Sequence, residues 1–128
     1  MHHVLLEVTV AGAAEAVLAA KGGADRIELC AALDVDGLTP SLGELVAARE
    51  SCPVPIVALV RPRPGNFVYS ADELIRMHAD IAAVFEHGAD AVAFGALTVE
   101  GTIDREACRG LLATCEGRPA VFHRAFDL

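Results

Sequence analysis

One local pattern occurs twice in this sequence, and this repeat limits the possible folds more than any other feature. The tripeptide Gly-Ala-Asp at residues 23–25 leads into a run rich in Ile and Leu, and the same tripeptide at residues 88–90 leads into a second apolar run. A glycine that can take a positive φ commonly closes a helix, so each copy predicts a helix end followed directly by a strand. Such a repeat predicts a chain built from successive βα units.

Apolar runs and stretches with helical periodicity alternate along the rest of the chain. Strands are predicted at residues 5–10, 26–31, 56–61, 91–97 and 120–124, and helices at residues 13–21, 41–50, 71–87 and 104–116. Successive strands begin ~20 to ~35 residues apart, which is typical of βα units with right-handed crossovers and a parallel sheet. The sequence therefore predicts an α/β fold in a single domain over residues 1–128.

Two helix starts carry capping chemistry. Ser70 with Glu73 forms the S-x-x-E pattern of a capping box. Thr39 followed by Pro40 predicts a hydroxyl cap before a first-turn proline.

The alternation of polar residues within the first two strands favours a barrel over a doubly wound sheet. A doubly wound sheet commonly has G-x-G-x-x-G after its first strand, whereas the turn here reads Ala-Gly-Ala-Ala. Polar side chains at alternate positions are typical of barrel strands, which have one face toward helices and the other toward the barrel interior. These residues are Glu7, Thr9, Arg26, Glu28 and Cys30. We expect a parallel (β/α) TIM-barrel type fold, truncated after its fifth strand.

Composition excludes several classes of partner. The formal net charge is −8 and the Lys and Arg residues are scattered, so nucleic acid is not expected to bind. No apolar run approaches the ~18 residues of a membrane span, and no export signal is present at the amino terminus, so we expect no membrane association and a cytoplasmic location. The four cysteines form no C-x-x-C pair, and we expect them to be reduced.

Several longer motifs resemble the CutC copper-homeostasis family. They are the segments at residues 6–8, 23–30, 37–41, 61–63, 67–70 and 122–127. The resemblance implies a (β/α)8 barrel, a link to copper and a full length about twice that of this chain, a usual size for such barrels. Two loop positions depart from the family pattern: Asp36 replaces a usual glycine, and Asn66 replaces a usual aspartate.

Chemically active side chains are predicted to gather at the carboxyl ends of the strands, where barrel enzymes place their sites. Glu7, Glu28 and His123 are the candidate proton-transferring residues, Arg61, Arg63, Arg124, Asp127, Thr39 and Ser41 are the candidate ligand-binding residues, and Cys30 is the candidate metal ligand. One interpretation is a pocket for a small anionic or polyol-like ligand. The other is that the two acids pair with Arg26, Arg61 or Arg124 and merely fill the barrel mouth.

Copper is the one cofactor that the resemblance implies, and Cu(I) prefers thiolate ligands. Cys30 ends the second predicted strand at the mouth, whereas Cys52 precedes the third strand at the opposite end, about 20 Å away for a strand of ~6 residues. Cys108 and Cys115 lie on a helix with an apolar stripe and are expected to fill the core. Among the four cysteines, only Cys30 is therefore a candidate copper ligand.

Three functions stay open at this point. The first is copper homeostasis, the second is an enzyme acting on a small molecule at the mouth, and the third is an oligomeric scaffold without catalysis. Five strands leave the first and the fifth as open edges, and open edges invite pairing, so a homodimer is expected.

Overall fold

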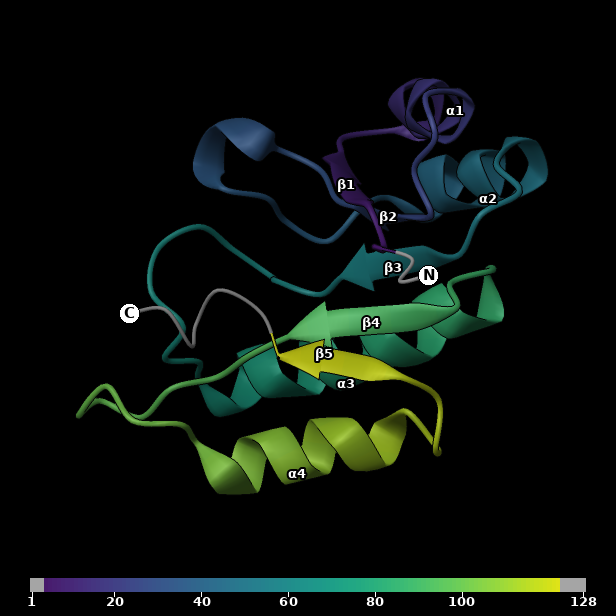
Figure 1. The fold of residues 1–128 in the computed structure, drawn as a ribbon. Helices are drawn as coiled ribbons and strands as arrows, with labels where there is room; N and C mark the ends of the chain where they lie inside the picture. Colours follow the sequence, from purple (N-terminus) through teal and green to yellow (C-terminus); the bar gives the residue numbers. More distant parts are fainter. Residues whose placement is uncertain (1–3, 123–128) are drawn as a thin grey trace.

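The chain folds into a curved parallel sheet with helices on one side (Figure 1). The computed structural model describes residues 4–122. The elements in chain order are β1 (Glu7–Val10), α1 (Ala13–Lys21), β2 (Arg26–Leu29), the short 3₁₀ helix η1 (Leu33–Val35), α2 (Leu42–Ser51), β3 (Ile56–Leu59), α3 (Ala71–Glu86), β4 (Ala91–Phe94), α4 (Arg105–Thr114) and β5 (Ala120–Phe122). The five strands lie in the order β1-β2-β3-β4-β5 and all pair in parallel, which confirms the predicted α/β fold.

The two faces of the sheet have different roles, because successive side chains of a strand point to opposite faces. One face packs on the helices and forms the main core, with Ile27, Leu29 and Ile56 fully buried. The other face, which we call the inner face, corresponds to the interior of a barrel. It carries a smaller apolar cluster of Cys30, Val57, Leu59, Ala91 and Ala93. The sheet is therefore part of a barrel wall rather than a flat layer.

The Gly-Ala-Asp repeat proves to be a clamp at the amino ends of the strands. The Asp25 carboxylate accepts a hydrogen bond from the Leu6 N–H at 2.7 Å, and the Asp25 N–H donates to the Leu6 carbonyl at 2.8 Å. Asp90 repeats both bonds with Ile56, each at 2.8 Å. Each copy thus forms two hydrogen bonds between the segment before one strand and the start of the neighbouring strand. The repeat therefore has a structural role.

The helix starts match the sequence prediction in one case and depart from it in the other. The Ser70–Glu73 capping box at α3 is confirmed. The predicted Thr39 cap is wrong, because Ser41 caps α2 by accepting from the Glu44 N–H at 3.1 Å. The Thr39 hydroxyl instead accepts a hydrogen bond from the Arg61 N–H at 2.9 Å.

The strands β2, β3 and β4 end earlier at their carboxyl ends than the apolar runs predict, whereas β1 ends at Val10 as predicted. Beyond Leu59 the chain bonds to loops, and the Thr39 N–H donates to the Arg61 carbonyl at 3.1 Å. Beyond β4 the Leu97 N–H donates to Phe67 at 2.8 Å. The loops after β2, β3 and β4 are therefore linked to one another over this edge of the sheet. No helix within residues 4–122 is long and apolar enough to cross a membrane.

Candidate functional site

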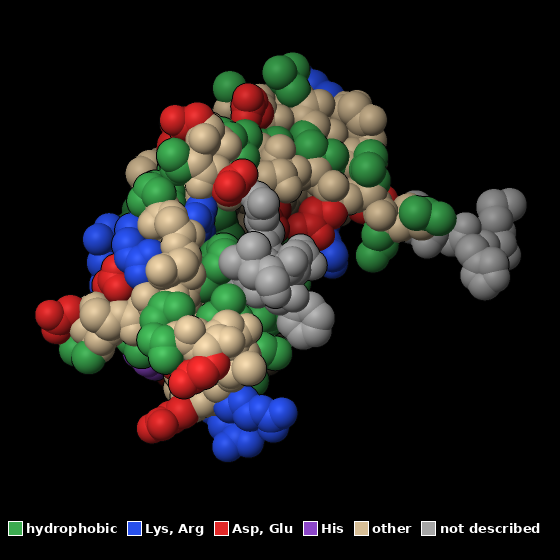
Figure 2. Space-filling view, turned by 90° about the vertical axis from the view of Figure 1, so that its left-hand side faces the viewer, with side chains coloured by type: hydrophobic (Ala, Val, Ile, Leu, Met, Phe, Trp, Pro, Cys, Tyr) green, Lys and Arg blue, Asp and Glu red, His purple; other side chains and the backbone are tan. Residues whose placement is uncertain are grey.

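The candidate site occupies the inner face and the carboxyl-end loops above it. Figure 2 looks onto this end of the molecule and shows hydrophobic side chains near its centre, with charged side chains around them. Of the predicted residues, the structure describes Glu7, Glu28, Cys30, Thr39, Ser41, Arg61 and Arg63. His123, Arg124 and Asp127 lie outside the described residues.

Glu7 lies at the wrong end of its strand for the role predicted from the sequence. It is the first residue of β1 and stands in register with Arg26, the first residue of β2. Its carboxylate accepts from the Arg26 Nε at 2.8 Å and lies 2.8 Å from Nη2. The prediction that Glu7 lies at a carboxyl end is therefore wrong, because β1 runs from Glu7 toward Val10. The ion pair closes the amino end of the inner face.

Glu28 is the acid of the inner face that has no bonded partner in the part of the chain that the structure describes. It lies in β2, two residues after Arg26 and two before Cys30, and it is half-buried. No hydrogen bond or ion pair to it forms among residues 4–122. Burial raises the pKa of the Glu28 carboxyl above its usual value, and the negative charge of Glu7 raises it further. In this environment the carboxyl group holds its proton more tightly than an exposed glutamate does.

Arg61 is buried and holds the loops of the mouth together. Its Nη1 donates to the carbonyls of Val35 and Gly37 at 2.7 and 2.9 Å, and its Nη2 donates to that of Gly65 at 2.9 Å. The guanidinium carbon lies 5.2 Å from the centre of the Phe67 ring. Arg61 therefore binds the loops after β2 and β3 into one unit, which a role in ligand binding alone would not require.

Arg63 is engaged in the loop between β3 and α3. Its Nη2 donates to the Val68 carbonyl at 2.7 Å, its Nη1 donates to the Asn66 carbonyl at 2.8 Å, and its Nε forms an ion pair with Glu73. The hydrogen bond from Arg63, followed by that from the Ser70 N–H, lowers the pKa of the Glu73 carboxyl. Thr39 and Ser41 are likewise used by the main chain, as described above. These three residues thus already have structural roles.

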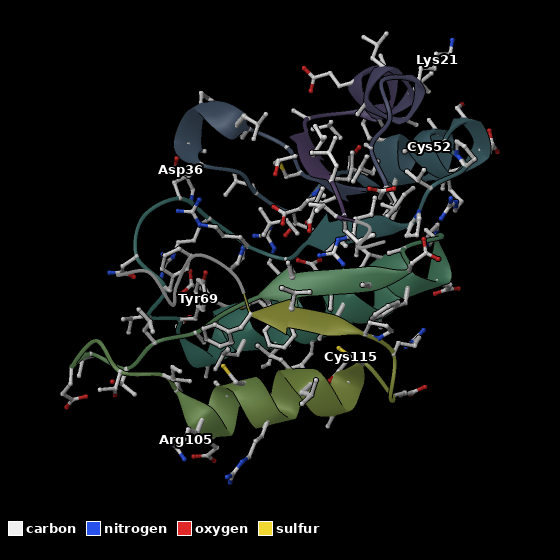
Figure 3. The ribbon with its side chains drawn as sticks, in the orientation of Figure 1. Lys21, Asp36, Cys52, Tyr69, Arg105 and Cys115 are labelled. Atoms are coloured by element: carbon white, nitrogen blue, oxygen red, sulfur yellow. The ribbon has the colours of Figure 1, made fainter. Side chains whose placement is uncertain are left out.

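Cys30 does not have the surroundings of a copper ligand in the part of the protein described here. Its thiol donates to the Val10 carbonyl at 3.4 Å, and burial raises its pKa to about 11, which disfavours the thiolate that binds metal. Within residues 4–122 no three His, Cys, Asp or Glu side chains are grouped so that they could hold a metal ion. Cys52 and Tyr69 lie at opposite ends of the sheet in Figure 3, and Tyr69 marks the mouth. The described residues do not fit a copper centre.

Sequence reasoning missed two aromatic residues that line the mouth. Phe67 is buried with Leu97, and Tyr69 packs beside them. The Arg63 guanidinium carbon lies 5.0 Å from the centre of the Tyr69 ring. Both aromatic residues belong to a motif that the resemblance is based on, at residues 67–70, and their alternation with Val68 was the available signal.

Comparison with known proteins identifies the family. The model of the CutC family matches residues 4–128. The chain belongs to the CutC family. The human "Copper homeostasis protein cutC homolog" is 48% identical over 124 residues, which cover 97% of this chain and 45% of the human protein. A CutC family protein of Porphyromonas gingivalis is 46% identical over 123 residues, which cover 96% of this chain and 50% of that protein. This CutC chain thus spans about half the length of the curated relatives it matches.

Solved structures agree with the family assignment. A crystal structure of CutC from Streptococcus agalactiae matches this CutC chain with a TM-score of 0.91 and 38% identity, over 98% of this chain and 61% of that one. Phosphonopyruvate hydrolase matches with a TM-score of 0.59 and 18% identity, over 88% of this chain and 42% of that one, which shows the fold alone. The five-stranded sheet is therefore a partial TIM-barrel-like fold.

Proposed function

We propose that this CutC chain contributes the acid–base half of an enzyme site that acts on a small anionic or polyol-like molecule, with Glu28 as the residue that moves the proton. The observation that carries the proposal is a half-buried carboxyl on the inner face with no bonded partner among residues 4–122. A carboxyl that is easily protonated can donate a proton to a hydroxyl or carboxylate oxygen and take one back. Glu7 and Arg26 form the closed base of this face.

Replacing Glu28 with glutamine is expected to raise the free energy of unfolding at pH 7. The pKa of Glu28 is raised in the folded state, so ionising it costs stability above its unfolded pKa, and glutamine removes this cost. Below about pH 4 the native carboxyl is protonated in both states, and the difference from the variant should vanish. Urea denaturation at the two pH values measures the effect. A matched control is Glu50→Gln at an exposed position of α2, which should change the free energy of unfolding by less than about 0.5 kcal/mol.

A direct titration of the Glu28 carboxyl by carbon NMR completes the test. The proposal requires its pKa to exceed that of an ordinary glutamate, and Glu7→Gln should lower it by removing a neighbouring negative charge. A Glu28 carboxyl that titrates like the exposed glutamates would exclude it as the proton-transferring group.

A second candidate function is copper homeostasis, which is favoured by the name of the human relative. Copper could be bound or handled by the whole protein without Cys30 as a ligand. Because the Cys30 thiol is buried and its pKa is raised to about 11, we expect Cys30→Ser to leave the Cu(I) content of this chain unchanged. Competition with a coloured Cu(I) chelator under reducing conditions measures that content. One equivalent of copper that disappears in Cys30→Ser would show the contrary and assign the thiol as a ligand.

Self-association remains a proposal that accompanies either function. Within residues 4–122, β1 and β5 each have a hydrogen-bonded neighbour on one side only, and Val121 of β5 is 44% exposed. Open strands and exposed apolar residues favour association. We expect light scattering of this chain to give the mass of a dimer. A soluble monomer that melts cooperatively would refute the expectation.

A further inference from the structure

Two polar atoms at the mouth are buried without hydrogen-bond partners among residues 4–122. Arg61 is 6% exposed, and its Nε has no acceptor within this range. The Tyr69 hydroxyl is also buried, and no described residue is its donor or acceptor. Buried polar groups in native proteins almost always have partners, so an orphaned pair indicates a group that binds there.

The two atoms belong to one small region of the mouth. Arg61 lies against the ring of Phe67, and Arg63 lies against the ring of Tyr69, two residues further along the same loop. Burial raises the pKa of the Tyr69 phenol, and the positive charges of Arg61 and Arg63 oppose this rise, so the hydroxyl lies within electrostatic reach of both. Arg61 lies close enough to the Tyr69 hydroxyl to lower the pKa of the phenol as a weak hydrogen bond does, but the contact lacks the geometry of a full hydrogen bond. Arg61 and the Tyr69 hydroxyl thus lie close together, and both can still form hydrogen bonds to a third group.

The Arg61 charge has no counterion among residues 4–122. Arg63 is paired with Glu73, but no carboxylate among residues 4–122 forms an ion pair with Arg61. The carbonyls that accept from Arg61 carry only partial charges. A buried cation is costly unless an anion compensates it, and guanidinium groups match the oxygens of carboxylates and phosphates.

We infer that Arg61 Nε and the Tyr69 hydroxyl bind an oxyanion group, a carboxylate or a phosphate, of the small molecule that enters the mouth. Nε–H donates to one oxygen of that group, and the Tyr69 hydroxyl donates to the same oxygen or to a second one. The inference rests on the proposed function for the presence of a ligand at this mouth, and it names the chemical group by which the ligand is held.

The chain contains one tyrosine and no tryptophan, so a spectroscopic signal from tyrosine reports Tyr69 alone. With fluorotyrosine incorporated, fluorine NMR should show a single resonance that shifts saturably when inorganic phosphate or acetate is added. Sodium chloride at equal ionic strength should give no saturable shift. Saturation by phosphate alone would identify a phosphoryl group, and saturation by acetate alone would identify a carboxylate. A response to both anions that equals the chloride response would overturn the inference.

Variants test the two atoms separately from the fold. Tyr69→Phe keeps the ring and should weaken phosphate or acetate binding roughly tenfold by calorimetry, because one hydrogen bond to a charged group is lost. Arg76→Gln removes an exposed cation from α3 and should leave binding unchanged. Equal affinity of Tyr69→Phe and the unmodified chain would contradict the assignment. Glu28→Gln should still bind the anion, so failure of the acid–base proposal would leave this result intact.

Discussion

Arg61→Met is expected to lower the free energy of unfolding by about 3 kcal/mol, because it leaves three loop carbonyls without their donor. These carbonyls belong to Val35, Gly37 and Gly65, and Arg61 is the buried group that joins them. Methionine preserves much of the apolar volume, so the loss reports the hydrogen bonds rather than a cavity. Urea denaturation followed by circular dichroism measures the effect.

The matched control for this variant is Arg76→Met, which removes an exposed arginine and should change stability by less than about 0.5 kcal/mol. Equal stability of the two variants would show that the loops are held by other contacts. Arg61→Lys provides a further comparison. It keeps the charge but cannot bridge carbonyls on two loops as the guanidinium fork does, so we expect it to recover only part of the loss.

Asp90→Ala is expected to lower the free energy of unfolding by about 2–3 kcal/mol. The Asp90 carboxylate accepts from the Ile56 N–H at the start of β3 and also from Arg49 Nη1 at 2.6 Å. Ile56 is fully buried, so its N–H would be left without an acceptor and without water. Thermal and urea denaturation measure the loss.

The repeat supplies its own control for this prediction. Asp25 makes the equivalent bond to Leu6, but Leu6 is 50% exposed and water can replace the lost acceptor. Asp25→Ala should therefore cost only about 1 kcal/mol. Equal losses of stability in the two alanine variants would show that burial of the Ile56 N–H does not determine the contribution of Asp90.

The order of elements could be predicted from sequence because its signals are local. Alternating apolar runs, the capping box at Ser70 and the repeated Gly-Ala-Asp each depend on residues a few positions apart. The parallel order of the five strands follows, since right-handed βα units place successive strands side by side. Thr39 was misassigned because its hydroxyl bonds to Arg61, a partner 22 residues away that no local pattern announces.

In the candidate site, too, local patterns predicted some features, and contacts between distant segments decided the others. Alternation within β2 correctly placed Glu28 and Cys30 on one face, because side chains of a strand alternate whatever surrounds them. Which charges would be paired could be predicted only in part, because Arg26 was one of several possible partners for Glu7 and Glu73 was not named as a partner of Arg63. The structure pairs Glu7 with Arg26 at the amino ends, pairs Arg63 with Glu73, and leaves Glu28 without a partner among the described residues.

The sequence by itself determined that this chain is a parallel α/β protein of the CutC family with acids and arginines near its strand ends. The tertiary structure decided which of them serve the fold. Arg61 and Arg63 are bound by loops, whereas Glu28, Arg61 Nε and the Tyr69 hydroxyl have no hydrogen-bond partner within residues 4–122. The physical reason is that bonding capacity and pKa depend on burial and on neighbours from distant segments, which only the folded chain brings together.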